Sequence, residues 1–202
     1  MKPTVRIIGG RLEWLVEMTQ SKQLVSSRKM LRPVSKKDLP ILASWFSDPL
    51  ILSEYDTPTK LDPADIEHAF EKHGYASKEL TWLMLCDENS RPAGVVTISV
   101  DESARHAEIG YVVAEQNARG KRLVTRALSE LLDDMAGKDS IDEVHAVVHP
   151  DNIASKTVLK RAGFEQTGIY TAHRFVNGGW VDFEVFSIKL KGTTDGVNAA
   201  NE

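Results

Sequence analysis

The feature that most constrains this chain is a strand that runs through a short basic loop directly into a helix, over residues 106–128. The strand pattern of residues 107–113 is followed by the loop Asn117-Ala-Arg-Gly-Lys-Arg122. A helical stripe of apolar side chains comes next, formed by Val124, Ala127, Leu128, Leu131, Leu132 and Met135. Such a junction gathers backbone N–H groups, the positive end of a helix and cationic side chains at one point. It therefore favours the binding of a multiply charged anion.

The loop matches neither of the common phosphate-binding loops. No Gly-Lys-Ser/Thr stands at the P-loop spacing, and the three glycines of the dinucleotide fingerprint are missing. Gly120 allows a ligand to approach the backbone, while Arg119, Lys121 and Arg122 can add charge-assisted bonds to phosphate. The alternative is a solvated basic turn.

Length and composition limit the class of protein. The 202 residues suit one domain with a full-sized core, and the net charge of −4 gives no support to nucleic-acid binding. No run of about 18 apolar residues predicts a membrane span, and no leader pattern opens the chain. Cys86 is the single cysteine, so an internal disulfide is excluded. We expect a soluble, cytoplasmic protein without nucleic-acid or membrane partners.

Alternation, caps and turns predict an α+β fold in the order βααβββαβαββ, with a mixed sheet. We expect an N-terminal extension at residues 1–23, a domain over residues 24–190 and a frayed tail at residues 191–202. The expected strands cover residues 29–33, 80–87, 93–100, 107–113, 143–148, 164–175 and 180–190. The expected helices begin at Lys36, at Asp62 (ending at Gly74), after the basic loop (ending at Gly137), and at Asn152 (ending before Gly163).

A second motif follows the fifth strand, at His149-Pro-Asp-Asn-Ile-Ala-Ser155. Asn152 is placed to cap the next helix, and Ser155 faces out of its first turn. On its own this pattern is equally explained as a capping motif.

Together the motifs resemble the GCN5-related N-acetyltransferase (GNAT) superfamily. The resemblance extends over residues 24–190. Four segments carry it, in the order in which the superfamily has them: Glu108-Ile-Gly-Tyr, Arg119-Gly-Lys, Asn152-Ile-Ala-Ser and Ala162-Gly-Phe164. Leu31-Arg-Pro and Phe46-Ser-Asp-Pro49 make the ribosomal-protein N-terminal acetyltransferase branch the nearest. The resemblance implies a mostly antiparallel sheet of six to seven strands, flanked by about four helices and splayed at the cofactor site.

The resemblance also implies an acetyl-CoA site. The strand that ends at Val112 and Val113 would splay from the strand over residues 144–148, and the pantetheine arm would fill the gap. Asn152 would contact that arm, and Ser155 would lie near the thioester sulfur. The pyrophosphate would be held by the backbone amides of Arg119, Gly120, Lys121, Arg122 and Leu123.

The sequence departs from the family pattern at two positions. Arg122 stands where the family loop usually has a small residue, so its side chain must point away or onto a phosphate. Leu159 stands where many members have a tyrosine that protonates the thiolate. That role must then fall to another residue, and the resemblance to the nearest branch implies Ser155.

Transfer of an acetyl group to an amine needs a base, donors for the carbonyl oxygen and a way for the thiolate to leave. Glu108 is the first candidate for the base, although it could simply pair with a cation. Tyr111 could also reach the cleft, and His149 could do so but is more typical of a loop residue. The backbone N–H of Val112 or Val113 is the natural donor to the carbonyl oxygen.

The remaining candidates are weaker. Cys86 lies in an apolar run and is expected in the core rather than as a nucleophile. The other histidines show no metal-ligand spacing, so no metal is expected. Aromatic side chains that could line the acceptor site, each also able to pack in the core, are Trp45, Tyr55, Tyr75, Tyr170 and Trp180. Asp182 is a further candidate for the lining, and Asp182 and Glu184 could attract a cationic amine.

The sequence thus predicts an acetyl-CoA-dependent N-acetyltransferase acting on a protein N-terminal α-amine or a small amine. The alternatives are an acyl-CoA-binding module without catalysis, and an enzyme that acetylates an amino sugar, an antibiotic or a polyamine. A homodimer through the closing hairpin is compatible with the sequence.

Overall fold

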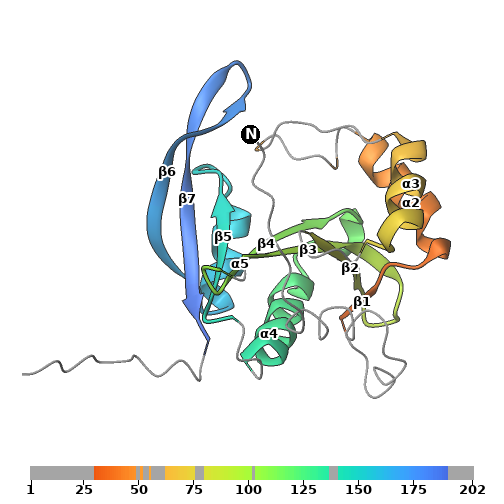
Figure 1. Cartoon of the computed structure of the whole chain (residues 1–202), viewed down its shortest axis with the longest axis horizontal. Coiled ribbons are helices and arrows are strands. Elements are labelled where there is room, and N and C mark those ends of the chain that lie inside the picture. The colour runs from red at the N-terminus through yellow and green to blue at the C-terminus, as the bar shows by residue number, and fades with distance from the viewer. Residues whose placement is uncertain are drawn as a thin grey trace, which may run out of the picture.

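One seven-stranded sheet organises the chain, with the strand order β1-β2-β3-β4-β5-β7-β6 (Figure 1). The structure, a computed structural model, describes residues 30–48, 51, 55, 62–75, 80–101, 103–136 and 141–190. The strands are β1 (Leu31–Pro33), β2 (Thr81–Cys86), β3 (Pro92–Asp101), β4 (His106–Val113), β5 (Glu143–Val148), β6 (Glu165–Val176) and β7 (Gly179–Lys189). The predicted extension, the tail and Gly137 lie outside the described residues.

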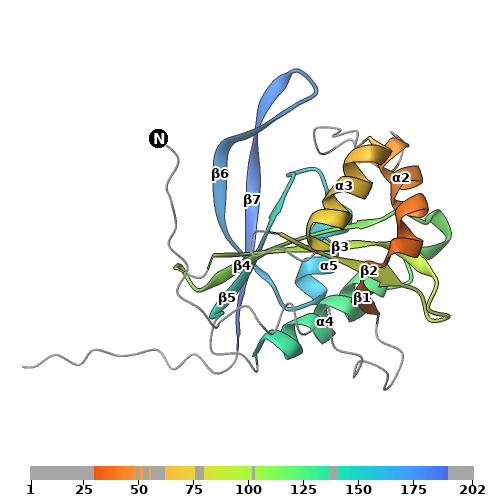
Figure 2. The ribbon, with the colours of Figure 1, turned by 45° about the vertical axis from the view of Figure 1, so that its right-hand side comes forward.

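Helices cover both faces of this sheet, as Figures 1 and 2 show from two directions. α4 and α5 pack on one face over a core that includes Ile98, Ile109 and Leu159, while α2 and α3 pack on the other over Met84 and Val95. The helices are α2 (Leu39–Ser47), α3 (Pro63–His73), α4 (Leu123–Ala136) and α5 (Ile153–Arg161), with short 3-10 turns η1 (Lys36–Asp38) and η2 (Gln116–Ala118).

Local signals place the helix ends where the sequence predicts them. The Asp62 side chain accepts a hydrogen bond from the Ala64 N–H at 2.8 Å, and Pro63 occupies the first turn of α3. Gly74 ends α3 in the left-handed conformation, with a φ of 60°. The helix expected from Lys36 begins instead as η1 and continues as α2.

The sheet is antiparallel except between β4 and β5, and that parallel pairing is very short. It comprises three pairs, His106↔Glu143, Ala107↔Val144 and Glu108↔His145. Beyond Glu108 the register between β4 and β5 ends, while β4 stays paired with β3 as far as Val113. The predicted splay of a mixed, mostly antiparallel sheet is therefore confirmed.

β6 and β7 form a long hairpin that extends past the rest of the sheet (Figure 2). β7 pairs with β5 over its second half, whereas β6 is an edge strand whose residues are mostly exposed. The hairpin places Arg174 and Phe183 beside the opening between β4 and β5.

Candidate active site

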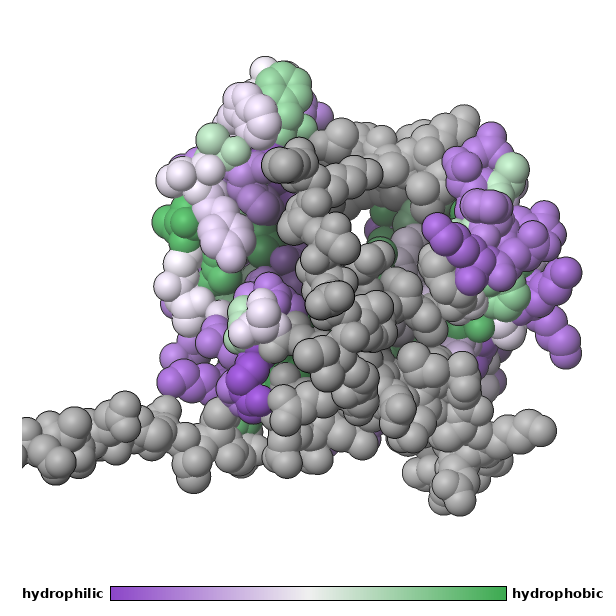
Figure 3. All heavy atoms as spheres, viewed as in Figure 1, coloured by the Kyte–Doolittle hydropathy of each residue, from purple (hydrophilic) through white to green (hydrophobic). Residues whose placement is uncertain are grey.

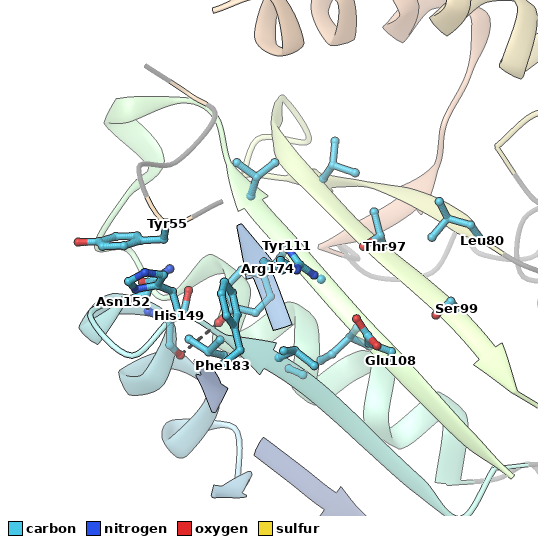
Figure 4. A pocket seen from close by; sticks show the side chains of 18 of the residues that line it. Tyr55, Leu80, Thr97, Ser99, Glu108, Tyr111, His149, Asn152, Arg174 and Phe183 are labelled. Atoms are coloured by element: carbon cyan, nitrogen blue, oxygen red, sulfur yellow. Dashed lines mark hydrogen bonds between the residues drawn. The ribbon is translucent and has the colours of Figure 1, made fainter. Parts of the chain in front are cut away.

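A cavity of about 500 Å³ lies where β4 and β5 diverge. β3 and β4 form one wall, β5 and the start of α5 form another, and the hairpin contributes from the side (Figure 4). The predicted site residues Glu108, Val112, Asn152 and Ser155 all line it, as do Tyr111 and His149. Further lining residues include Phe46, Tyr55, Trp82, Thr97, Ser99, Arg174 and Phe183.

Glu108 lies at the closed end of the divergence and belongs to the last parallel pair. One of its carboxylate oxygens, Oε2, lies 3.2 Å from Nε2 of His145, and 42 % of its side chain stays exposed. The hydrogen bond with His145 lowers the pKa of Glu108, and partial burial opposes this shift without reversing it. Nearby Arg174 and His173 add to the lowering. Glu108 is therefore a carboxylate at neutral pH.

Asn152 and Ser155 come from the first turn of α5. The side-chain oxygen of Asn152 accepts a hydrogen bond from the Ser155 N–H at 3.0 Å, which caps the helix as predicted. Tyr111 donates its hydroxyl to the Ser155 carbonyl oxygen at 3.2 Å and so joins β4 to α5 across the opening. Leu159, one turn after Ser155 on α5, is fully buried in the core.

The basic loop ends β4 and leads into α4. Arg119, Gly120, Lys121 and Arg122 are exposed, whereas Leu123 is buried. Gly120 has a φ of 75°, and no atom lies within 4 Å of the position that a Cβ would take. Its backbone is thus open to a ligand. Open amides, three exposed cations and a helix start suit a diphosphate, so these residues fit the pyrophosphate of CoA.

Arg122 adopts the left-handed conformation, with a φ of 59°. Glycine in this position would carry little strain, whereas arginine, like other residues with a Cβ, carries a penalty of about 1–2 kcal/mol. The Arg122 carbonyl accepts the Arg126 N–H at 3.1 Å, so the strained residue is also the point where α4 starts.

The backbone direction distinguishes Val112 from Val113. Ala114 donates its N–H to Ala93 on β3, and N–H groups alternate sides along a strand. The Val112 N–H therefore points toward β3, and that of Val113 faces the opening. The Val113 carbonyl accepts a hydrogen bond from Nε of Arg119 at 3.1 Å, which ties the basic loop to this edge.

His149 contributes more to the cavity than its sequence position suggested. Its Nδ1 accepts the Asp151 N–H at 3.1 Å, and its ring lies against Tyr55 and edge-on to Phe183. The His-Pro dipeptide predicted a loop, and no local pattern shows that two aromatic rings from distant segments meet this imidazole.

Several other candidates lie elsewhere. Trp45 and Tyr75 are core residues: the Trp45 indole donates to Glu115 at 3.0 Å, and the Tyr75 hydroxyl donates to the Ile66 carbonyl at 2.9 Å. Tyr170, Trp180 and Asp182 are exposed on the hairpin.

Two further residues are accounted for by contacts outside the cavity. Glu184 pairs with Lys156 of α5 at 2.7 Å. Cys86 is buried, and burial raises the pKa of its thiol. The burial of Cys86 and the raised pKa of its thiol agree with a structural role for this residue.

Within residues 30–190, apart from the gaps given above, no group of three metal-ligating side chains comes together. None of the described helices has the length and apolar character needed to cross a membrane. Figure 3 shows hydrophilic side chains over the outer side of the α2–α3 pair.

Comparison with known proteins identifies the fold and the family. The family model of the acetyltransferase (GNAT) domain matches residues 28–165, more than half of the chain. The uncharacterized N-acetyltransferase p20 of Bacillus licheniformis is 23% identical over 172 residues, which cover 82% of this chain and 94% of p20.

Two solved structures share the fold. The microcin C7 self-immunity acetyltransferase MccE, in complex with acetyl-CoA and AMP, superposes with a TM-score of 0.72 at 23% identity, covering 86% of this chain and 99% of MccE. The ribosomal-protein-S5-alanine acetyltransferase from Vibrio fischeri superposes with a TM-score of 0.67 at 19% identity, covering 83% and 97%.

These findings confirm the predicted superfamily, and a ribosomal-protein acetyltransferase is among the structures with the same fold. They also confirm acetyl-CoA as the cosubstrate and N-acetyl transfer as the activity. The chain belongs to the GNAT family of acetyltransferases.

Proposed function

We propose that this enzyme moves the acetyl group of acetyl-CoA directly to a primary amine, either a protein N-terminal α-amine or a small amine. The observation that carries the proposal is the divergence of β4 from β5, with Glu108 at its closed end and the basic loop at its open end. A carboxylate at the closed end attracts an ammonium group, and cations at the open end attract a diphosphate.

Different groups of the site would bind different parts of acetyl-CoA, which supplies the activated thioester. The amides of Arg119 through Leu123 would hold the pyrophosphate at the start of α4. The Asn152 side-chain oxygen already caps α5, so its amide nitrogen is the group left for the pantetheine arm. Val113, rather than Val112, would donate its N–H to the thioester carbonyl oxygen.

Glu108 would act on the amine. An alkylammonium group has a pKa of about 10.4 in water, so it must lose a proton before its nitrogen can attack. The Glu108 carboxylate faces the cavity and is ionised at neutral pH, so it can receive that proton directly or through a water molecule. A covalent route through Cys86 is disfavoured because its thiol is buried and hard to ionise.

Ser155 is the proposed donor to the departing thiolate. It lines the cavity at the first turn of α5, and the position of the usual family tyrosine is occupied by the buried Leu159. Tyr111 supports this arrangement by fixing the Ser155 carbonyl.

The first experiment measures binding separately from turnover. Acetyl-CoA at 100 times its Kd should stabilise the folded protein by about 2.7 kcal/mol in thermal unfolding. Gly120→Glu should abolish this effect because it adds bulk and negative charge at the pyrophosphate. Gly178→Glu is the matched control, since Gly178 also has a positive φ, of 88°, and open space around it. No stabilisation of the wild type at millimolar acetyl-CoA would remove the cofactor site.

The second experiment measures thiol release with N-terminal peptides, polyamines and aminoglycosides as acceptors. Glu108→Gln should lower the rate and change its pH profile, and Ser155→Ala should lower turnover more than acetyl-CoA affinity. Equal rates for Ser155→Ala and the wild type would exclude Ser155 from the reaction. Acetyl-CoA binding without turnover on any acceptor would favour a binding module.

We also propose a cytoplasmic location, a homodimer through the closing hairpin, and a catalytic domain over residues 24–190 between an extension and a tail. Size-exclusion chromatography with light scattering would decide the oligomeric state.

A further inference from the structure

A polar row crosses the sheet at the closed end of the cavity. Ser99 on β3 is opposite Glu108 on β4, Glu108 is opposite His145 on β5, and His145 is opposite Ser187 on β7. Residues opposite one another in a sheet share a face, so the row presents four polar side chains side by side. His145 and Ser187 are the buried members of the row, and buried polar side chains are costly unless they are paired. Ser187 pairs with the hydroxyl of Thr167 at 2.9 Å, so the partner of His145 is the contact to explain.

His145 is the buried member of the pair that it makes with Glu108. It is 9 % exposed, and its Nε2 lies 3.2 Å from Oε2 of Glu108. An ionised carboxylate can only accept a hydrogen bond, so the neutral imidazole must carry its proton on Nε2. The ring is further held edge-on to His106, with 4.8 Å between ring centroids.

We propose that His145 is a positioning residue for Glu108, fixing Oε2 by donation from Nε2 and leaving Oε1 to meet the amine. The inference rests on the proposed function of Glu108 as the base. Because Glu108 and His145 form the last of the three parallel pairs, the carboxylate is anchored where the pairing of β4 with β5 ends. A side chain that is 42 % exposed would otherwise sample several rotamers.

The same contact sets the basicity of Glu108. The hydrogen bond from His145 is the largest cause that lowers the pKa of Glu108, so loss of the donor would raise that pKa. Among the described residues, further charged or titratable groups of this region are His106 on β4 and His173 and Arg174 on β6, while β3 and β7 contribute the hydroxyls of Ser99 and Ser187.

Two substitutions test the donor. His145→Gln keeps an N–H donor at the position of Nε2, whereas His145→Ala removes it. We expect His145→Ala to lower kcat by about tenfold, part of the 10²–10⁴-fold that a positioned base contributes, with KM for acetyl-CoA unchanged. His145→Gln should restore most of kcat at pH 8.

The pH profile gives the readout that a purely structural role would not move. The acid limb of kcat/KM should follow the protonation of Glu108, and it should move to higher pH in His145→Ala because the hydrogen bond that lowers the pKa of Glu108 is lost. His145→Gln keeps an N–H donor, so its acid limb should lie near that of the wild type. His68→Gln on the exposed side of α3 is the matched control and should leave the profile unchanged. Superimposable profiles for His145→Ala and the wild type would overturn the proposal.

A titration in the absence of substrate tests the contact itself. Carboxyl carbon NMR of the free protein should show that His145→Ala raises the pKa of Glu108, because the hydrogen bond from His145 that lowers it is lost. An unchanged Glu108 titration would show that the pair does not form in solution and would equally overturn the proposal. If the wild type releases no thiol with any amine, the proposed function fails, while this titration still decides whether His145 and Glu108 are paired.

Discussion

Tyr111 on β4 and Ser155 on α5 are joined by a hydrogen bond of 3.2 Å from the tyrosine hydroxyl to the serine carbonyl oxygen. This bond spans the opening where the two halves of the sheet no longer pair. Burial raises the pKa of Tyr111 to about 12, and the bond to Ser155 offsets only part of that rise. The hydroxyl therefore keeps its proton throughout the neutral and mildly alkaline range.

Tyr111→Phe should lower the free energy of unfolding by about 1 kcal/mol, the usual net contribution of one hydrogen bond. A tyrosine pKa that is raised on folding adds stability below its unfolded value of about 10, and that stability is lost as pH rises through the folded value. The difference in the free energy of unfolding between Tyr111→Phe and the wild type, measured by urea denaturation, should thus be constant from pH 6 to pH 9. Tyr170→Phe, at an exposed position of β6, should change stability little.

Arg122 should respond differently to glycine and to alanine. Arg122→Gly relieves the left-handed strain, so it should be more stable than Arg122→Ala by about 1 kcal/mol in thermal or chemical unfolding. Both variants lose the same cation, so both should bind acetyl-CoA more weakly, with a reduced dependence on salt. If both variants bind as tightly as the wild type, the Arg122 side chain does not contact a phosphate.

Gly94→Ala should be among the most damaging single changes in the sheet. A Cβ at Gly94 would lie 2.0 Å from the Val112 carbonyl oxygen, so β3 and β4 would have to separate beside the cavity. We expect a loss of about 4 kcal/mol or more in the free energy of unfolding, or no folded protein. Gly179→Ala, where no atom lies within 4 Å of the new Cβ, is the control and should unfold like the wild type.

Asp38→Asn should weaken the junction of β1, η1 and α2. The Asp38 carboxylate accepts two bonds of 2.7 Å from Arg32, and it also accepts from the Ser35 N–H and hydroxyl. Burial raises the pKa of Asp38, but these hydrogen bonds outweigh it, and the net shift is downward. Since Arg32 is partly exposed, we expect a loss of about 2 kcal/mol at pH 7.

The sign of the pH dependence follows from that downward shift. Stability from Asp38 is present above its unfolded pKa of about 3.9 and is lost as pH falls through the lower folded value. Urea denaturation curves of Asp38→Asn and the wild type should therefore differ at pH 7 and approach each other below pH 3. Asp87→Asn, which removes an exposed pair with Arg91, should have a much smaller effect at pH 7.

The elements with local signals were predictable from the sequence. Asp62 and Gly74 mark the ends of α3 by hydrogen bonding and backbone conformation, and β5 has the predicted bounds Glu143–Val148. These signals involve residues within a few positions of one another, so they can be recognised without knowledge of the tertiary structure. The order of the motifs then indicated the family, and the family indicated the splay.

Contacts between distant segments were not predictable in the same way. Tyr75 was a candidate for the acceptor site because of its chemistry, but its ring stacks on Trp82 in the core. His149 was interpreted as a loop residue, yet it lines the cavity. Glu108 and His145 are 37 residues apart in the chain, and their pairing depends on the register between β4 and β5. No pattern along one strand specifies that register.

The three pairs that join β4 to β5 make the sheet two antiparallel units with a narrow seam. Residues 31–113 supply one unit in a continuous run, and residues 143–189 supply the other. Each unit keeps its own backbone hydrogen bonds when the seam opens, so amide exchange should report two cooperative blocks with different protection. A cosubstrate bound between the units would contact both of them, and its binding should merge the two blocks into one.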